Sequence, residues 1–182
     1  MKPIILAILF VACFSPVVAV MATEEEADTC ASTPGFQRLD FWLGHWDVYV
    51  GARKVGINHI EKVLDGCAVT EDWQGNGGGG GRSLFYYFPP TDTWKQVWIT
   101  GQATKPGGVK EKTMVEEFPE GGVRFQGDIT MKSGRTYLDR TTLTPLAGGR
   151  VQQVIEVSRD GGGTWKITFD AVYVPQGEAP SE

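Results

Sequence analysis

Six side chains within β-type runs of this sequence have the chemistry to bind a small molecule. The runs are rich in tryptophan, tyrosine and β-branched residues. Ligand pockets combine such apolar walls with a few polar groups that orient the ligand. Arg140 shares a face of its run with Leu138 and Thr142, and Glu156 shares one with Val154. The predicted ligand-binding residues are Glu71, Trp73, Gln96, Trp98, Arg140 and Glu156.

Two of these residues carry opposite charges and could form a pair. A charge that points into a barrel must be paired, because burying it alone is costly. An ion pair between Arg140 and Glu156 across neighbouring strands would satisfy both groups. Such a pair could be structural, or it could bind a polar group of a ligand.

Catalysis has less support in the residue types, and no residue is assigned a catalytic role. The sequence shows no serine-nucleophile motif, no histidine-centred triad and no thiol nucleophile. Glu71 and Glu156 could do acid–base work if both carboxylates lined one cavity, and His45 is another candidate base. A barrel enzyme therefore stays as an alternative to a binding protein.

The two histidines do not predict a metal centre. His45 and His59 could meet across adjacent strands with Asp47 or Glu61 nearby. A zinc or copper site would need one or two further nitrogen or sulfur ligands. Haem barrels of the nitrobindin type bind iron through a late histidine, and this chain has none after His59. We expect no metal and no cofactor.

Two glycine-rich segments are predicted to be hairpin turns. Residues 76–83 fail as a phosphate-binding loop, because asparagine replaces the required first glycine, arginine replaces lysine and an aromatic strand follows. Residues 158–165 resemble the Asp-box hairpin motif. In such a turn Asp160 accepts backbone hydrogen bonds and Trp165 packs beneath the glycines.

The spacing of the β-type runs predicts an all-β, single antiparallel up-and-down barrel of about ten strands. Within residues 94–99, both tryptophans and Gln96 fall on one face of a strand. Within residues 164–174, Ile167 falls on the same face as Phe169 and Tyr173. The predicted strands lie near residues 45–51, 55–64, 67–74, 82–88, 94–100, 111–118, 122–131, 135–144, 150–158 and 164–174.

The N-terminal segment, residues 1–22, has the pattern of a secretory signal peptide. A lone basic Lys2 precedes an apolar run, and small residues allow cleavage after Ala19 or Ala22. An uncleaved membrane anchor and lipidation at Cys13 are the alternatives. The predicted divisions after the signal are a flexible leader at 23–34, a barrel domain at 35–175 and a polar tail at 176–182.

Charge and cysteine content narrow the partners and the compartment. The chain has a formal net charge of −5 and no basic cluster, which argues against nucleic acid and anionic membrane surfaces as partners. Cys30 and Cys67 follow the predicted signal, and in an exported protein such a pair favours a disulfide over two buried thiols. We expect a secreted or periplasmic protein without stable membrane insertion after signal cleavage.

Gly44 and Trp46 form a G-x-W sequence that resembles the signature of lipocalins and other calycins. A wider set of motifs, beginning with the sequence FWLGHWD, is similar to an uncharacterised family of secreted bacterial proteins whose first motif reads F-D-F-W-L-G-x-W. This resemblance implies a calycin-like barrel and a Cys30–Cys67 disulfide, and it carries no established activity. Phe85 and Thr100 depart from the family pattern, and residues 101–118 match it poorly.

These observations favour an exported barrel that binds a small, partly aromatic molecule. One alternative is a lyase, isomerase or hydrolase that uses pocket carboxylates or His45 as acid or base. Another is an envelope protein whose exposed aromatic side chains contact a second protein.

Overall fold

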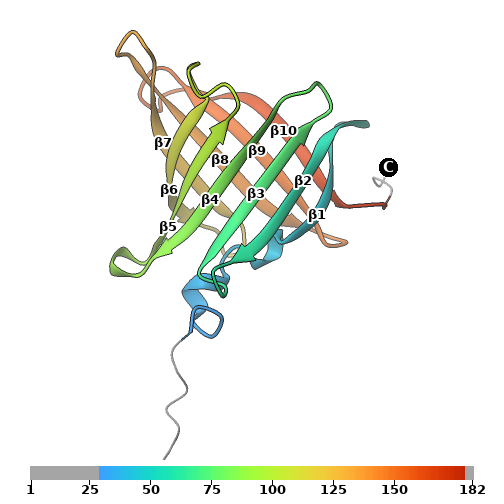
Figure 1. Ribbon diagram of the computed structural model, residues 1–182. Coiled ribbons are helices and arrows are strands. Elements are labelled where there is room, and N and C mark those ends of the chain that lie inside the picture. The colour runs from blue at the N-terminus through green and yellow to red at the C-terminus, as the bar shows by residue number, and fades with distance from the viewer. Residues whose placement is uncertain (1–28, 179–182) are drawn as a thin grey trace, which may run out of the picture.

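The computed structural model describes residues 29–178, which form a closed antiparallel barrel of ten strands in sequence order (Figure 1). Consecutive strands pair along the chain, and β10 returns to pair with β1, so no sheet edge stays open. The predicted all-β, up-and-down barrel is confirmed. The strands are β1 Gly44–Val50, β2 Arg53–Val63, β3 Ala68–Gly75, β4 Gly80–Phe88, β5 Thr93–Thr100, β6 Val109–Glu117, β7 Val123–Thr130, β8 Thr136–Leu146, β9 Arg150–Ser158 and β10 Lys166–Pro175.

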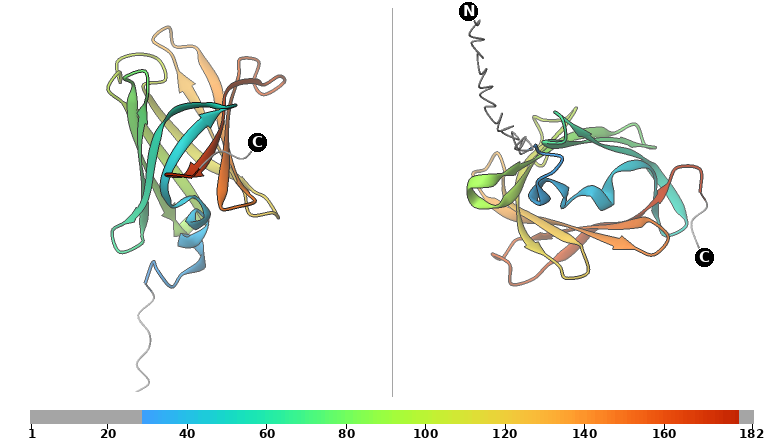
Figure 2. Two further views of the ribbon diagram at one scale, coloured as in Figure 1. Left: turned by 90° about the vertical axis from the view of Figure 1, so that its right-hand side faces the viewer. Right: turned by 90° about the horizontal axis from the view of Figure 1, so that it is seen from below.

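Two short 3₁₀ helices, η1 (Pro34–Gln37) and η2 (Asp40–Trp42), cross one end of the barrel (Figure 2). The Trp42 side chain of η2 is fully buried among Phe85 and Tyr173. The Trp46 indole donates a hydrogen bond to the Trp42 carbonyl oxygen at 3.0 Å. The aromatic side chains therefore close this end, which we call the plugged end. A third 3₁₀ helix, η3 (Pro89–Thr91), forms the loop between β4 and β5.

The predicted disulfide is confirmed, since Cys30 and Cys67 are bonded with their Cα atoms 4.9 Å apart. It ties the turn at residues 29–33 to the loop between β2 and β3. The predicted signal peptide at residues 1–22 lies outside the described residues, as do residues 23–28 of the predicted leader. Within residues 29–178, no helix is long and apolar enough to cross a bilayer.

The Asp-box turn forms the hairpin between β9 and β10, as predicted. Ser158 Oγ donates to Asp160 Oδ1 at 2.7 Å, and the Thr164 backbone N–H donates to the same oxygen at 2.9 Å. These hydrogen bonds, with Ser158 as the largest contributor, lower the pKa of the Asp160 carboxyl. The Trp165 ring is only half-buried, because it lies on the outer wall rather than in the interior.

The predicted orientation of Ile167 in β10 is wrong. Ile167 is exposed, whereas Phe169 and Tyr173 point into the barrel. The pairing of β10 with β9 slips by one residue between Ile167 and Phe169, where Thr168 is the extra residue. A bulge of this kind breaks the two-residue alternation, so the residues on either side of it face opposite ways.

Candidate ligand-binding site

The barrel interior changes from apolar to polar to aromatic along the strands. From the plugged end, β3 contributes Val69, then Glu71 and then Trp73 to the interior. β5 runs in the same direction as β3 and contributes Trp94, then Gln96 and then Trp98 to the interior, as the alternation predicted. The apolar residues complete the core against the plug. The polar and aromatic residues beyond them form the candidate site.

Glu71 is the centre of a buried hydrogen-bond network. Asn58 Nδ2 donates to Glu71 Oε1 at 2.8 Å, and Ser83 Oγ donates to Glu71 Oε2 at 2.6 Å. Burial is the largest influence on this carboxyl and raises its pKa, although both hydrogen bonds and the charge of Lys112 oppose that effect. The network therefore holds a carboxyl group away from water in the middle of the barrel.

Three further hydrogen bonds connect this network to a cavity wall. Gln96 Nε2 donates to Ser83 Oγ at 3.1 Å. On the other side, the Tyr173 hydroxyl accepts a hydrogen bond from Asn58 at 3.1 Å and donates one to Gln153 Oε1 at 2.8 Å. Gln96 and Gln153 both line the cavity described below, so each end of the chain of hydrogen bonds meets the space where a ligand would lie.

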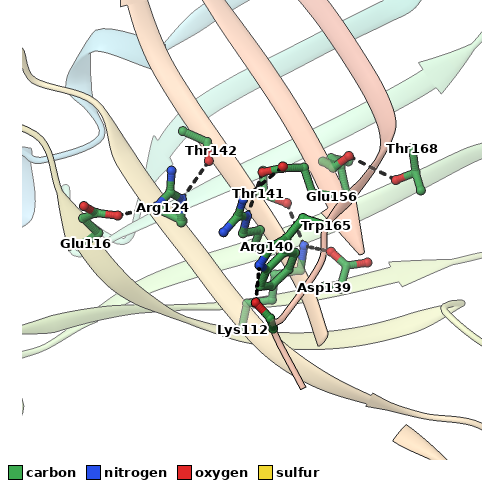
Figure 3. A network of polar contacts seen from close by, with 12 residues as sticks. Lys112, Glu116, Arg124, Asp139, Arg140, Thr141, Thr142, Glu156, Trp165 and Thr168 are labelled. Atoms are coloured by element: carbon green, nitrogen blue, oxygen red, sulfur yellow. Dashed lines mark hydrogen bonds and ion pairs between the residues drawn. The ribbon is translucent and has the colours of Figure 1, made fainter. Parts of the chain in front are cut away.

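A second polar cluster surrounds Lys112 (Figure 3). Lys112 Nζ donates to Asp139 Oδ1 and, at 2.6 Å, to Thr141 Oγ1. Lys110 Nζ lies 2.6 Å from the other oxygen of Asp139. Burial lowers the pKa of the Lys112 ammonium to about 8, although the Asp139 charge acts in the opposite direction. Gly127 of β7 is the interior residue paired with Asp139, and its missing side chain lets Lys112 of β6 reach β8.

Two cavities lie above these clusters. They share the lining residues Trp98, Gln153 and Ile155, so the two cavities are adjacent. The aromatic cavity, of about 170 Å³, is lined by Trp73, Trp98, Gln153, Ile155, Phe169 and Tyr173. The polar cavity, of about 120 Å³, is lined by Gln96, Trp98, Lys110, Lys112, Thr141, Gln153 and Ile155.

The barrel opens to solvent at the end opposite the plug, between the loops that join β3 to β4 and β5 to β6. This mouth has a volume of about 730 Å³, and Trp73 and Trp98 line both it and the aromatic cavity. Glycines let the two indoles lie against the wall. A Cβ at Gly56 would come within 2.5 Å of Trp73, and one at Gly81 within 2.4 Å of Trp98.

The structure brings together four of the six predicted ligand-binding residues. Trp73, Gln96 and Trp98 line the cavities, and Glu71 reaches the wall through Ser83. Gln96 Oε1 is buried and has no hydrogen-bond partner among residues 29–178. Buried polar atoms are nearly always paired, and a ligand or a water in the cavity that Gln96 lines would supply the donor for this oxygen.

Arg140 and Glu156 lie on the outer wall. They form a two-point ion pair, with Arg140 Nε and Nη2 at 2.7 and 3.0 Å from the two oxygens of Glu156. The guanidinium stacks over the Trp165 ring at 3.8 Å (Figure 3). Its hydrogen bonds hold the pKa of Glu156 below the usual range. Because Asp139 and Thr141 point inward, Arg140 between them points outward and lines neither cavity.

The two histidines also lie on the outer wall. His45 of β1 is paired with His59 of β2, and their rings stack with centroids 3.8 Å apart. His59 Nε2 is 3.9 Å from Glu61. In the described part of the chain, no group of three or more His, Cys, Asp and Glu side chains is placed to hold a metal ion. His45 is therefore not positioned to act as a base in the cavity.

The chain is a closed up-and-down β-barrel with a buried aromatic cluster, an architecture that suits a ligand-binding barrel. A scan against protein-family models and a search of curated proteins gave no match to it. The resemblance to the family with the F-D-F-W-L-G-x-W motif stays a prediction.

Proposed function

We propose that this protein is an exported barrel that binds a small, partly aromatic molecule in its interior. The single observation that carries the proposal is the pair of adjacent cavities next to Trp98, one with aromatic walls and the other with the polar groups of Gln96 and Lys112. A mostly apolar cavity with a few convergent polar groups is the usual form of a ligand site.

The size of the aromatic cavity fits one ring. Its volume of about 170 Å³ is close to the ~150 Å³ cavity that holds benzene in another protein. Phe169 packs edge-on against Trp73, with ring centroids 6.3 Å apart, and fixes one side of this space. A planar ring would contact aromatic side chains there, and aromatic pairs prefer such edge-on or offset contacts.

Export is supported by the Cys30–Cys67 disulfide. Disulfides persist in oxidising compartments and are rare where thiols are kept reduced. Together with the signal-peptide pattern of residues 1–22, the bond supports a secreted or periplasmic location.

Native mass spectrometry of protein purified from its own host tests the proposal. We expect a retained small molecule in the wild type and its loss in Gly81→Ala, because the new methyl group forces Trp98 into the cavity. Gly101→Ala is the matched control at the same mouth, since a Cβ there meets no atom within 4 Å. A wild-type protein that is empty and also binds no added aromatic compound would refute the proposal.

A barrel enzyme is the second candidate, and one observation favours it. Lys112 lines the cavity, and its lowered pKa of about 8 lies in the range suited to a general base. The carboxylate pair considered from the sequence does not share one cavity, since Glu71 is inside and Glu156 outside. Under this alternative, the retained molecule would be converted by the wild type and recovered unchanged from Lys112→Met.

A further inference from the structure

The polar cavity is lined by a hydrogen-bond acceptor without a donor, Gln96 Oε1, and by the ammonium group of Lys112. Gln96 of β5 and Lys112 of β6 are direct cross-strand partners, and both are buried and line the cavity. Side chains at directly opposite positions leave the sheet about 4.5–5.5 Å apart at Cβ. Because the cavity that they share is only about 120 Å³, a polar group of a ligand inside it lies near both side chains.

The hydrogen bonds already formed define what that polar group must do. Gln96 uses Nε2 to donate to Ser83, which leaves Oε1 without a donor. Lys112 has three N–H groups and directs two of them at Asp139 and Thr141. The ligand group must accept a hydrogen bond from Lys112 and donate one to Gln96 Oε1.

A hydroxyl group meets both requirements through one oxygen, because it has one donor and two acceptor positions. An ether oxygen accepts from Lys112 but offers nothing to Gln96. A carboxylate also only accepts, and it would place negative charge against Gln96 Oε1. An ammonium group would meet Gln96 but would repel Lys112.

We propose that the ligand is a phenol, meaning a single aromatic ring with a hydroxyl group that lies between Gln96 and Lys112. The inference rests on the proposed function and specifies its ligand class. The ring occupies the aromatic cavity between Trp98 and Phe169, and its hydroxyl group extends into the adjacent polar cavity, which shares Trp98, Gln153 and Ile155 with it.

The test compares compounds of one shape by calorimetry and by quenching of tryptophan fluorescence. The probes are 4-methylphenol, 4-methylanisole, toluene and 4-methylbenzoate. We expect 4-methylphenol to bind about tenfold or more tighter than the other three, since hydrogen bonds to charged groups contribute that much to affinity. Tighter binding of 4-methylbenzoate would overturn the assignment in favour of an anion site.

Variants separate the hydroxyl contact from binding of the ring. Lys112→Met leaves Asp139 paired with Lys110, and Gln96→Met keeps the length of the side chain. Each should bring the affinity for 4-methylphenol to within about twofold of that for 4-methylanisole, with toluene binding unchanged. Lys95→Met is the matched control, because Lys95 extends over Phe88 away from the cavity.

The possible failures are distinguishable. If all four probes bind the wild type with similar affinity, the hydroxyl assignment is refuted while the aromatic binding site stands. If none binds, the hydroxyl assignment and the aromatic site are refuted together. If selectivity for 4-methylphenol persists in Lys112→Met and Gln96→Met, the hydroxyl does not lie between these residues and the assignment is refuted.

Discussion

Asp139→Asn should be among the most destabilising single substitutions in the barrel, although it changes only one atom. Asp139 is 1% exposed and is the counter-ion of both Lys110 and Lys112. The asparagine keeps the shape of the side chain but removes its negative charge. Lys112, whose side chain is 3% exposed, then stays charged without a neutralising partner, or loses its proton.

The size of the effect follows from this burial. Removing one partner of a buried ion pair costs about 3–5 kcal/mol, because the other charge stays out of water. For a domain of this size, each kcal/mol lowers Tm by about 2–4 °C. We therefore expect Asp139→Asn to melt about 6–20 °C below the wild type. Lys112→Met should cost far less, because Asp139 keeps Lys110 at 2.6 Å.

Thermal and urea unfolding, followed by tryptophan fluorescence, measure these differences. The double variant Asp139→Asn with Lys112→Met should recover at least half of the lost stability, since it removes the stranded charge. A loss under 1 kcal/mol in Asp139→Asn would refute the reasoning, and so would a double variant that is no more stable than the single one. Asp128→Asn on β7 is the matched control, because Asp128 is exposed.

Three other predictions concern charge and covalent structure. The pKa of Lys112 is lowered from 10.5 to about 8, so between these pH values the unfolded chain binds more protons than the folded protein. The stability of the wild type relative to Lys112→Met, measured by urea titration, should therefore rise as the pH increases from about 8 to 10. Cys67→Ser should lower the free energy of unfolding by about 4 kcal/mol, because the disulfide closes a loop over a separation of 37 residues. Chemical reduction of the wild type should lower its stability by the same amount. Arg140→Met should cost only about 1 kcal/mol and leave the affinity for 4-methylphenol unchanged, because its ion pair is partly solvated and lies outside the cavity. A marked loss of affinity in Arg140→Met, measured by calorimetry, would contradict that placement.

The sequence predicted the fold well because each strand is short, alternating and bounded by turn residues. Residues 94–99 show why this works, since an uninterrupted strand places Trp94, Gln96 and Trp98 on one face. Alternation failed at Ile167, where a bulge that no residue type signals shifts the register by one. The alternation of residues along a strand predicts which side chains point inward only where the hydrogen-bonded pairing with the next strand is regular.

Alternation also grouped Arg140 with Leu138 correctly but could not say which face was inside. Leu138 suggested the interior, yet it lies on the outer wall, where the turn at Gly162 covers it and Trp165 stacks on Arg140. A hairpin turn that folds back over the sheet gives the outer face an apolar cover. That contact joins residues more than twenty positions apart, so the sequence of a single strand does not contain it.

The residues that the sequence did not reveal are polar groups whose partners lie on other strands. Lys112 and Asp139 are 27 residues apart on β6 and β8, and they meet only because Gly127 leaves the intervening position empty. Lys112 stands in a run of charged residues that is typical of a solvated strand. The reach of a lysine across a glycine depends on strand order and register, which residue types along one strand do not specify.

Glycines inside the barrel also explain why a cavity exists at all. Gly56 and Gly81 stand at positions where a side chain would fill the space now occupied by Trp73 and Trp98. A barrel optimised only for stability would have apolar side chains at these glycine positions. It would also have apolar residues in place of Glu71, Lys112 and Asp139, because well-packed apolar residues often stabilise a core more than buried charges do. Instead, Trp42 and Trp46 close the plugged end, and the polar groups line a cavity near the two indoles at the mouth. That combination costs stability and leaves buried polar groups facing a cavity, which is the physical argument for ligand binding.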